Sequence, residues 1–217
     1  MPKLLTLLLL ISFNLQAQYR ASEWKSRDKW QNAQEILKSL DLQSGSHVAD
    51  IGCHEGYLTF KLAPLVGDQG KVYAVDVEQY KLDRIQRKLS EHKLKNVETI
   101  LGDYDDPKLP PNVLDAVVIL DTYHEFEDYQ TILKHIYQGL KPGGRLVLVE
   151  PIAKERLDWS RKRQAVKHEI AMRFAVKDLT EAGFIIKKKR DPFIDRPSKN
   201  DRMWMTVALK PTVKTKN

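Results

Sequence analysis

Three aspartates in the first half of the chain each follow a short apolar run, in surroundings that suit a small ligand. Asp50 opens a turn that contains Gly52 and Gly56, and glycine lets a backbone turn sharply and approach a ligand closely. Asp76 ends the next apolar run, where a carboxylate can accept hydrogen bonds from both hydroxyls of a ribose. Asp103 offers an acceptor for an exocyclic amine, and Asp50 could orient a bound ammonium. The set predicts a ligand with an ammonium group, a ribose and an amino-bearing base.

The glycine turn matches neither of two familiar phosphate-binding patterns. A P-loop would place Lys after its second glycine, but Tyr57 follows Gly56. A dinucleotide fingerprint would need glycines at positions 54 and 57, where the chain has His54 and Tyr57. A ribose acceptor without a pyrophosphate cradle favours an adenosine-containing ligand that carries no phosphates.

A second polar group, Asp121 to Glu125, follows the apolar run from Leu114 to Leu120. His124 titrates near neutral pH and could accept a proton during catalysis, with Asp121 and Tyr123 as further candidates. The alternative, which the sequence leaves equally open, is that Asp121 caps the next helix while Tyr123 and His124 line the pocket without moving protons.

The sequence does not favour a metal centre. The single cysteine, Cys53, excludes a disulfide framework within the chain and a zinc site made of several thiolates. We interpret it as a small packing residue. Four neighbouring residues could ligate iron or zinc, but acidic loop residues are usually solvated, so we expect none. These four are His124, Glu125, Glu127 and Asp128.

Short apolar strands alternate with amphipathic helices from residue 47 to residue 150, which predicts parallel pairing through right-handed crossovers. The result is an open α/β sheet covered on both faces, with ligands at the carboxyl ends of the strands. The predicted strands are His47–Ile51, Lys71–Val77, Val97–Leu101, Leu114–Leu120 and Arg145–Glu150, and the predicted helices are Lys29–Leu40, Gly56–Leu65, Tyr80–His92 and Asp128–Leu140.

The rhythm changes after Pro151. We predict one helical stretch over Arg161–Ala182, an extended segment over Phe184–Lys189, a proline-containing loop, and a last strand over Met203–Leu209. The pair His168-Glu169 then lies on an exposed helical face or, alternatively, above the active site. One domain over residues 28–211 accounts for the chain, with 212–217 a frayed tail.

These segments together resemble the class I S-adenosylmethionine-dependent methyltransferases over nearly the whole chain. The likeness is carried by the glycine turn, Asp76, Gly102-Asp103, and three later segments: Asp121-Thr122-Tyr123-His124-Glu125-Phe126, Leu140-Lys141-Pro142-Gly143-Gly144-Arg145-Leu146, and Asp178-Leu179-Thr180-Glu181-Ala182-Gly183-Phe184. It implies a doubly wound, mostly parallel sheet of seven strands with the last strand antiparallel. It further implies that Asp50, Gly52 and Gly56 surround the methionine part of S-adenosyl-L-methionine, Asp76 binds the ribose and Asp103 binds the adenine amine.

The resemblance predicts methyl transfer to a small molecule by direct displacement. The family turn usually reads D-x-G-x-G-x-G, and His54 replaces its middle glycine, although histidine is among the residues enriched at positive φ. One alternative is therefore a noncatalytic binding protein of the same fold, with a basic face for an anionic partner. Another is a nucleic-acid methyltransferase. The chain lacks the Asn-Pro-Pro-Tyr segment by which amino-methylating relatives grip a planar amine, which argues against adenine-N6 or cytosine-N4 as the target.

The charge is divided unevenly along the 217 residues, whose formal net charge is +7. Residues 153–217 hold 18 Lys and Arg against 8 Asp and Glu, a net of +10, whereas residues 18–152 have a net of −4. The densest basic runs contain no aromatic residues on which bases could stack, so nucleic acid is not favoured. We interpret the basic C-terminal region either as a peripheral contact with an anionic membrane or as solvated charges on an edge strand.

The first residues are typical of a secretory signal peptide. Lys3 precedes an apolar stretch over Leu4–Leu15, and Ala17 is the small residue at which signal peptidase would cut. We expect a cleaved signal and a periplasmic or secreted protein. A membrane anchor is the less favoured alternative, because the stretch is shorter than the about 20 residues that span a bilayer.

Overall fold

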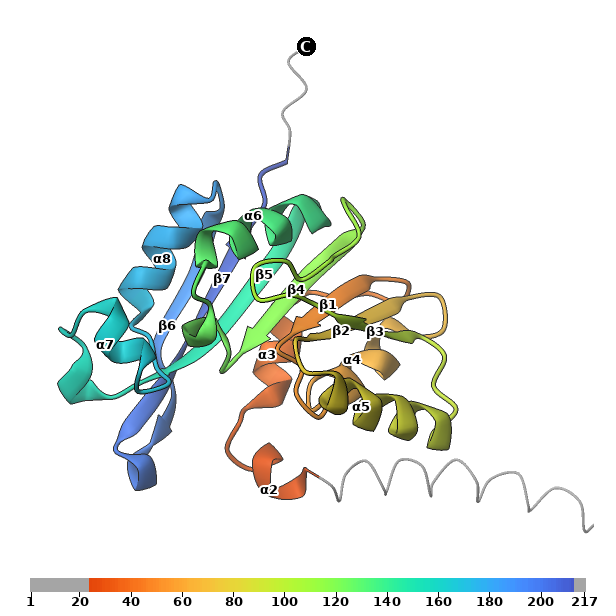
Figure 1. The fold of residues 1–217 in the computed structure, drawn as a ribbon, viewed down its shortest axis with the longest axis horizontal. Coiled ribbons are helices and arrows are strands. Elements are labelled where there is room, and N and C mark those ends of the chain that lie inside the picture. Colours follow the sequence, from red (N-terminus) through yellow and green to blue (C-terminus); the bar gives the residue numbers. More distant parts are fainter. Residues whose placement is uncertain (1–23, 213–217) are drawn as a thin grey trace, which may run out of the picture.

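Seven strands form one sheet in the computed structural model, which describes residues 24–212 (Figure 1). The order across the sheet is β3-β2-β1-β4-β5-β7-β6. Strands β1 to β5 pair in parallel, and β7 runs antiparallel to both β5 and β6. The predicted doubly wound α/β fold with an antiparallel last strand is confirmed. The strands are β1 His47–Ile51, β2 Lys71–Asp76, β3 Val97–Leu101, β4 Leu114–Leu120, β5 Leu140–Ile152, β6 Ile185–Arg196 and β7 Asp201–Leu209.

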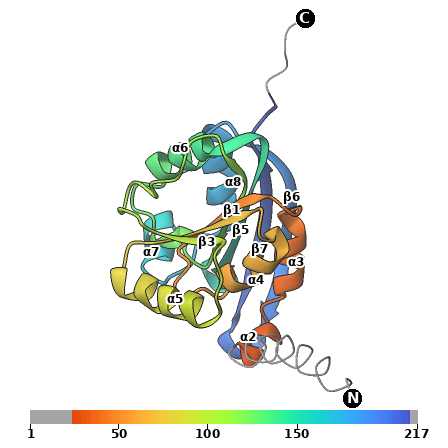
Figure 2. The ribbon, with the colours of Figure 1, turned by 90° about the vertical axis from the view of Figure 1, so that its right-hand side faces the viewer.

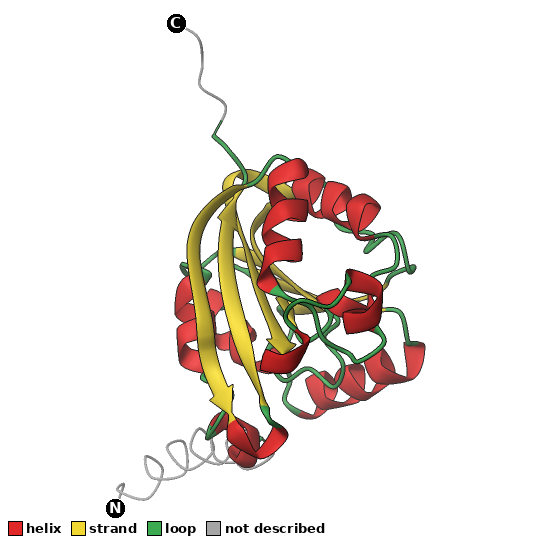
Figure 3. Ribbon diagram, turned by 90° about the vertical axis from the view of Figure 1, so that its left-hand side faces the viewer, coloured by secondary structure: helices red, strands yellow, loops and turns green. Residues whose placement is uncertain are grey.

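Helices cover both faces of this sheet, as Figures 2 and 3 show. Helices α3, α4 and α5 pack on one face, and α6 and α8 pack on the other. The helices are α2 Lys25–Asp28, α3 Ala33–Ser39, α4 Thr59–Val66, α5 Gln79–Glu91, α6 Tyr129–Gly139, α7 Arg161–Ala165 and α8 Met172–Glu181, and the 3₁₀ turns of the described residues are η1 Tyr123–Glu125, η2 Lys154–Arg156 and η3 Pro197–Lys199.

The central strands are mostly apolar because both of their faces are buried. In β4, Val117 and Ile119 pack toward α6 and α8, while Ala116 and Val118 pack toward α3 and α4. The one polar residue of β4, Asp115, lies near its start and is paired with Lys141, and the strand is apolar and buried from Ala116 to Leu120. The polar residues that can reach the pocket therefore follow the strand.

The predicted continuous helix over 161–182 is wrong, because the chain forms two helices, α7 and α8, with a bent connection. The cause is Gln164, whose buried side chain accepts a hydrogen bond from the amide of Ala171 at 2.8 Å. Its amide nitrogen donates to the carbonyls of Arg156 and Leu157 at 2.6 and 3.1 Å. A side chain that satisfies three backbone groups holds the connection in place of a helical turn.

The segment after Lys189 was predicted as a loop, whereas β6 continues through it to Arg196. Proline disrupts a ladder of hydrogen bonds, but β6 is the edge strand and its pairing with β7 shifts register between Arg190 and Ile194. Pro192, which follows a cis peptide bond, lies inside this irregularity.

The predicted signal peptide over residues 1–17 lies outside the described residues, as does most of the predicted tail over 212–217. Among residues 24–212, none of the helices combines the length and the apolar character that a membrane span requires. Cys53 is buried beside Phe60 and Ala74, and burial raises the pKa of its thiol, which agrees with a packing role.

Candidate active site

A pocket of about 390 Å³ opens at the carboxyl ends of the parallel strands, beside the point where β1 and β4 adjoin and the strand order reverses. Open α/β sheets bind their ligands at this point, and the volume lies within the about 300–1,000 Å³ of ligand sites. The polar lining includes Gly52, Asp76, Lys81, Asp103, Asp121, Thr122 and Glu125, and the apolar lining includes Ile51, Val75, Val77, Pro107, Phe126 and Ile132.

Gly52 lies at φ +71°, in the left-handed region that favours glycine. A Cβ atom at this position would lie 2.3 Å from Cγ2 of Thr122, which is closer than any real contact. The turn after β1 therefore packs directly on the turn after β4, and any side chain at position 52 would push them apart at the pocket wall.

Asp76 ends β2 with both carboxylate oxygens oriented by backbone amides. Its Oδ2 accepts from the amide of His54 at 3.0 Å, and its Oδ1 accepts from the amide of Glu78 at 3.1 Å. Each oxygen keeps a further lone pair, and Lys81 Nζ lies 3.6 Å from Oδ1. The residue predicted to bind a ribose is thus a fixed, pocket-lining acceptor.

His54 occupies the place of the family's middle glycine at φ +49°, a conformation that histidine tolerates. Its backbone amide, rather than its side chain, connects the glycine turn to Asp76. With histidine at this position, the hydrogen bond between the glycine turn and the end of β2 is present.

Asp103 lies on the pocket rim beside Tyr104, whose ring is 77% exposed. Its Oδ2 accepts from Lys108 Nζ at 3.0 Å, and its own amide donates to the carbonyl of Asp106 at 2.7 Å. Both the carboxylate and the aromatic ring are available at the end of β3.

Asp50 and Gly56 are not among the pocket-lining residues. Asp50 is buried beneath the turn and accepts from Thr59 Oγ1 at 2.6 Å. Burial raises its pKa to about 6, although the hydrogen bond from Thr59 and the charge of Arg27 act in the opposite direction. Gly56, at φ +88°, packs against the ring of Phe60. Both residues support the conformation of the turn without lining the pocket.

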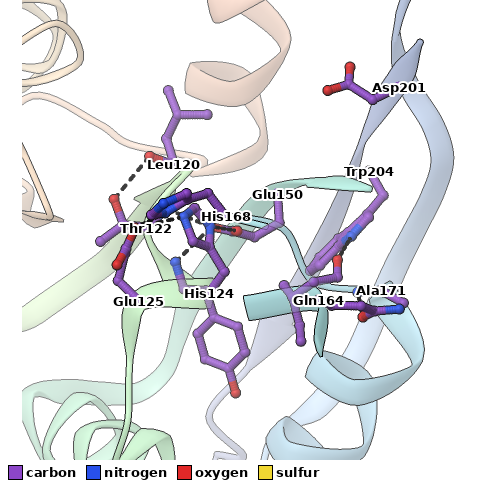
Figure 4. Close-up of polar contacts among 12 residues, drawn as sticks. Leu120, Thr122, His124, Glu125, Glu150, Gln164, His168, Ala171, Asp201 and Trp204 are labelled. Atoms are coloured by element: carbon purple, nitrogen blue, oxygen red, sulfur yellow. Dashed lines mark hydrogen bonds and ion pairs between the residues drawn. The ribbon is translucent and has the colours of Figure 1, made fainter. Parts of the chain in front are cut away.

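The group after β4 is organised by a residue that the sequence analysis did not single out, Glu150 near the end of β5 (Figure 4). Its fully buried carboxylate accepts from the amides of Thr122 and Tyr123 at 2.6 and 2.7 Å. The other oxygen lies 2.7 Å from Nδ1 of His124. The signal that could have revealed it was a lone carboxylate at the end of an apolar strand.

The His124 ring is almost fully buried, and Glu150 fixes its chemistry. We assign the proton to Nδ1, because a carboxylate can only accept there, which leaves Nε2 with its lone pair. Burial lowers the pKa of His124, but the hydrogen bond and charge of Glu150, with the charges of Asp121 and Glu125, outweigh it and raise the pKa overall. The pair has the form of a proton acceptor held by an orienting carboxylate.

The two other candidates after β4 differ from His124 in position. Asp121 lines the pocket at φ +58°, and it does not cap the next helix, because Asp128 caps α6 by accepting from the amide of Thr131. Tyr123 is fully buried, and its hydroxyl donates to Asp178 at 2.8 Å, away from the pocket lining.

His168 and Glu169 do not lie on the predicted exposed helical face, because the chain is not helical there. Glu169 is buried and accepts from the amide of Ala153 at 2.9 Å. His168 reaches the site instead, with Nδ1 2.6 Å from Oε1 of Glu125 (Figure 4). The alternative placement, above the active site, therefore holds for His168.

The lining of the pocket fits S-adenosylmethionine in its hydrogen-bond acceptors and its apolar walls. Asp76 and Asp103 supply acceptors at the ends of adjacent strands, and Val75, Val77 and Pro107 supply apolar walls for a base. Because Gly52 has no side chain, its backbone itself borders the pocket at the turn.

Comparison with known proteins identifies the family of the chain. Residues 42–205 match the family model described as a methyltransferase domain. A demethylmenaquinone methyltransferase of Geobacillus sp. (strain WCH70) is 34% identical over 122 residues, which cover 56% of this chain and 51% of the relative. The enzyme of the same name from Lactococcus lactis subsp. lactis (strain IL1403) is 33% identical over 127 residues, 58% of this chain and 50% of the relative. The chain thus spans about half the length of the curated relatives it matches.

A solved structure shows the same fold. A SAM-dependent methyltransferase from Aquifex aeolicus superposes with a TM-score of 0.69 at 23% identity, over 82% of this chain and 89% of that one. The strand order, the pocket at its reversal point and the family match lead to one conclusion: the chain belongs to the methyltransferase domain family and has the class I methyltransferase fold.

Proposed function

We propose that the protein methylates a small, planar acceptor that must lose a proton as the methyl group arrives. The observation that carries this proposal is the His124–Glu150 pair, which lies directly after β4, next to the pocket-lining residues Thr122 and Glu125. A methyltransferase needs a base only where the nucleophile carries a removable proton.

Bound S-adenosylmethionine supplies a methyl group on a positively charged sulfur, ready for direct displacement. Asp76 accepts hydrogen bonds from the ribose hydroxyls, and Asp103 from the adenine amine. Glu150 holds the Nδ1 proton of His124, and Nε2 receives the proton of the acceptor through Glu125, which lines the pocket and whose Oε1 lies 3.0 Å away. The remaining contribution of the protein is to hold the two reactants in line and exclude water.

Two observations support a planar, small-molecule acceptor. Phe126 and Tyr104 place aromatic groups at the pocket, where a flat ring could stack. The relatives named demethylmenaquinone methyltransferase indicate by that name an acceptor with a quinone nucleus. We therefore propose a hydroxylated or quinol-type ring as the acceptor class.

Calorimetric titration with S-adenosylmethionine and S-adenosylhomocysteine tests the cofactor half of the proposal. We expect micromolar binding of both, a large loss in Asp76→Ala, and binding within about threefold of the unsubstituted protein in His54→Gly. If neither ligand bound at millimolar concentration and His54→Gly restored the binding, the result would instead support a noncatalytic protein whose turn is blocked by His54.

Transfer of a labelled methyl group from S-adenosylmethionine to a panel of quinols and phenols tests the acceptor half. We expect turnover of at least one ring acceptor and none with RNA or DNA. Methylation confined to nucleic acid, with a steep dependence of affinity on salt, would overturn the small-molecule assignment.

We also propose export through cleavage after Ala17 and a peripheral contact of the edge strand β6 with an anionic membrane. Lys187 and Lys189 are exposed on β6, while Lys188 and Arg190 pair with Glu35. Sequencing the N-terminus of the protein from fractionated cells checks the first part, which an intact Met1 would refute. Sedimentation with vesicles of phosphatidylglycerol, compared with phosphatidylcholine, checks the second, and equal binding to both would refute it.

A further inference from the structure

His124, Glu125 and His168 form a cluster of three metal-ligating side chains at the edge of the pocket. Nε2 of His124 lies 3.0 Å from Oε1 of Glu125, and Nδ1 of His168 lies 2.6 Å from the same oxygen. One atom from each residue falls within 4.8 Å of the others. The prediction that no metal binds concerned ligands from the loop after β4 alone. His168 belongs to another part of the chain, between α7 and α8.

With the proton assigned to Nδ1, Nε2 of His124 has a lone pair that can bind a cation. Glu150 holds the proton on Nδ1, so the lone pair of Nε2 faces a carboxylate oxygen. Two acceptors at 3.0 Å repel each other unless a positive ion lies between them, either a second proton or a metal ion. Figure 4 shows the three side chains converging, and Glu150 lies 2.7 Å from the other ring nitrogen of His124.

We propose that His124, Glu125 and His168 bind one divalent transition-metal ion. Two imidazoles and a carboxylate with open positions are a set that zinc and iron accept. Glu150 supplies the carboxylate that fixes the ring of a metal-binding histidine through its other nitrogen. The side chains of Glu125 and His168 are 54% and 73% exposed, so they have room to rearrange. They can therefore make space for an ion that lies about 2.0–2.2 Å from each ligand atom.

The role of the ion rests on the proposed methyl transfer to a hydroxylated acceptor, but with the ion bound Nε2 of His124 would be a ligand and would not take the acceptor's proton. Glu125 lines the pocket, so an open coordination position would face the acceptor. An acceptor hydroxyl bound there would release its proton to water, and its oxygen would stay on the ion as an alkoxide or phenolate. That oxygen would then take the methyl group, and the sulfur would leave as the neutral thioether.

The test uses the full chain without a polyhistidine tag, and Zn²⁺ as the probe. We expect calorimetry to give one Zn²⁺ per chain, and Co²⁺ to give a visible absorption band of a coordinated ion. His168→Ala and Glu125→Gln change exposed side chains and should weaken Zn²⁺ binding at least tenfold. Glu150→Gln should weaken it about 10–100-fold.

His135→Ala is the matched control, because His135 Nδ1 lies 3.6 Å from Oδ1 of Asp106 in a histidine–carboxylate pair outside the cluster. The affinity of the His135→Ala variant for Zn²⁺ should equal that of the unsubstituted protein. Absence of Zn²⁺ binding, or binding that survives both His168→Ala and Glu125→Gln, would overturn the inference. Titration of the same preparation with S-adenosylmethionine separates the two proposals, since cofactor binding without Zn²⁺ binding removes only the metal site.

Discussion

Nδ1 of His124 lies 2.7 Å from Oε2 of Glu150, and both side chains are buried where β4 and β5 end side by side. Glu150 also accepts from two backbone amides of the turn that carries His124. One carboxylate thus fixes both the backbone and the ring of the residue proposed to take a proton.

Glu150→Gln should reduce kcat by about 100-fold or more while leaving affinity for S-adenosylmethionine unchanged. Because the basic form of His124 is the reactive one, the rate should rise with pH, with a midpoint above the ordinary histidine pKa of about 6.5. The variant should shift this midpoint downward, since burial then acts without the carboxylate. Steady-state rates from pH 5 to 9 check this, with the exposed Glu181→Gln as control; an unchanged midpoint would contradict the role of Glu150.

Gly52→Ala should destabilise the fold far more than Gly45→Ala. Both glycines have positive φ, so each alanine costs about 1–2 kcal/mol of backbone strain. A Cβ at position 45 meets nothing within 4 Å, whereas one at position 52 would collide with Thr122. Overpacking should add at least about 1–3 kcal/mol at position 52. Urea unfolding measures both, and equal losses would show that the turns after β1 and β4 do not press on each other.

Asp50 should make stability fall as pH rises from about 4 to 6. The folded state keeps the Asp50 proton up to about pH 6, whereas the unfolded chain loses it near 3.8, so the folded state binds more protons in this interval. Asp50→Asn should remove the loss, which amounts to about 3 kcal/mol. Thr59→Val removes a hydrogen bond to the ionised form and should extend the fall to higher pH. Unfolding curves between pH 4 and 8 would refute this if Asp50→Asn ran parallel to the unsubstituted protein.

Gln164→Ala should cost about 1–3 kcal/mol, because it leaves the buried amide of Ala171 without a partner. Gln138→Ala, on the exposed side of α6, should change stability by less than about 0.5 kcal/mol. Since Gln164 holds the connection that carries His168, the variant should also lose Zn²⁺ affinity. Thermal unfolding and Zn²⁺ titration together check this, and a variant as stable as Gln138→Ala would refute the bracing role.

The sequence by itself was enough for the doubly wound sheet and for the pocket-lining positions of Gly52, Asp76, Asp103 and Asp121. Strands buried on both faces are mostly apolar, so they stand out as runs, and polar residues gather where the runs end. In parallel strands those ends meet at one edge, which brings Asp76 and Asp103 together without any knowledge of side-chain contacts.

Only the tertiary structure decided which of these residues work together. Glu150 and Gln164 act through partners that lie 26 and 7 residues away, so neither their burial nor their hydrogen bonds follow from local spacing. The helix expected over 161–182 has the right apolar period, but the buried amide of Gln164 outweighs helical propensity there. That break carries His168 to Glu125, 43 residues away, and so the candidate metal cluster exists only in the folded chain.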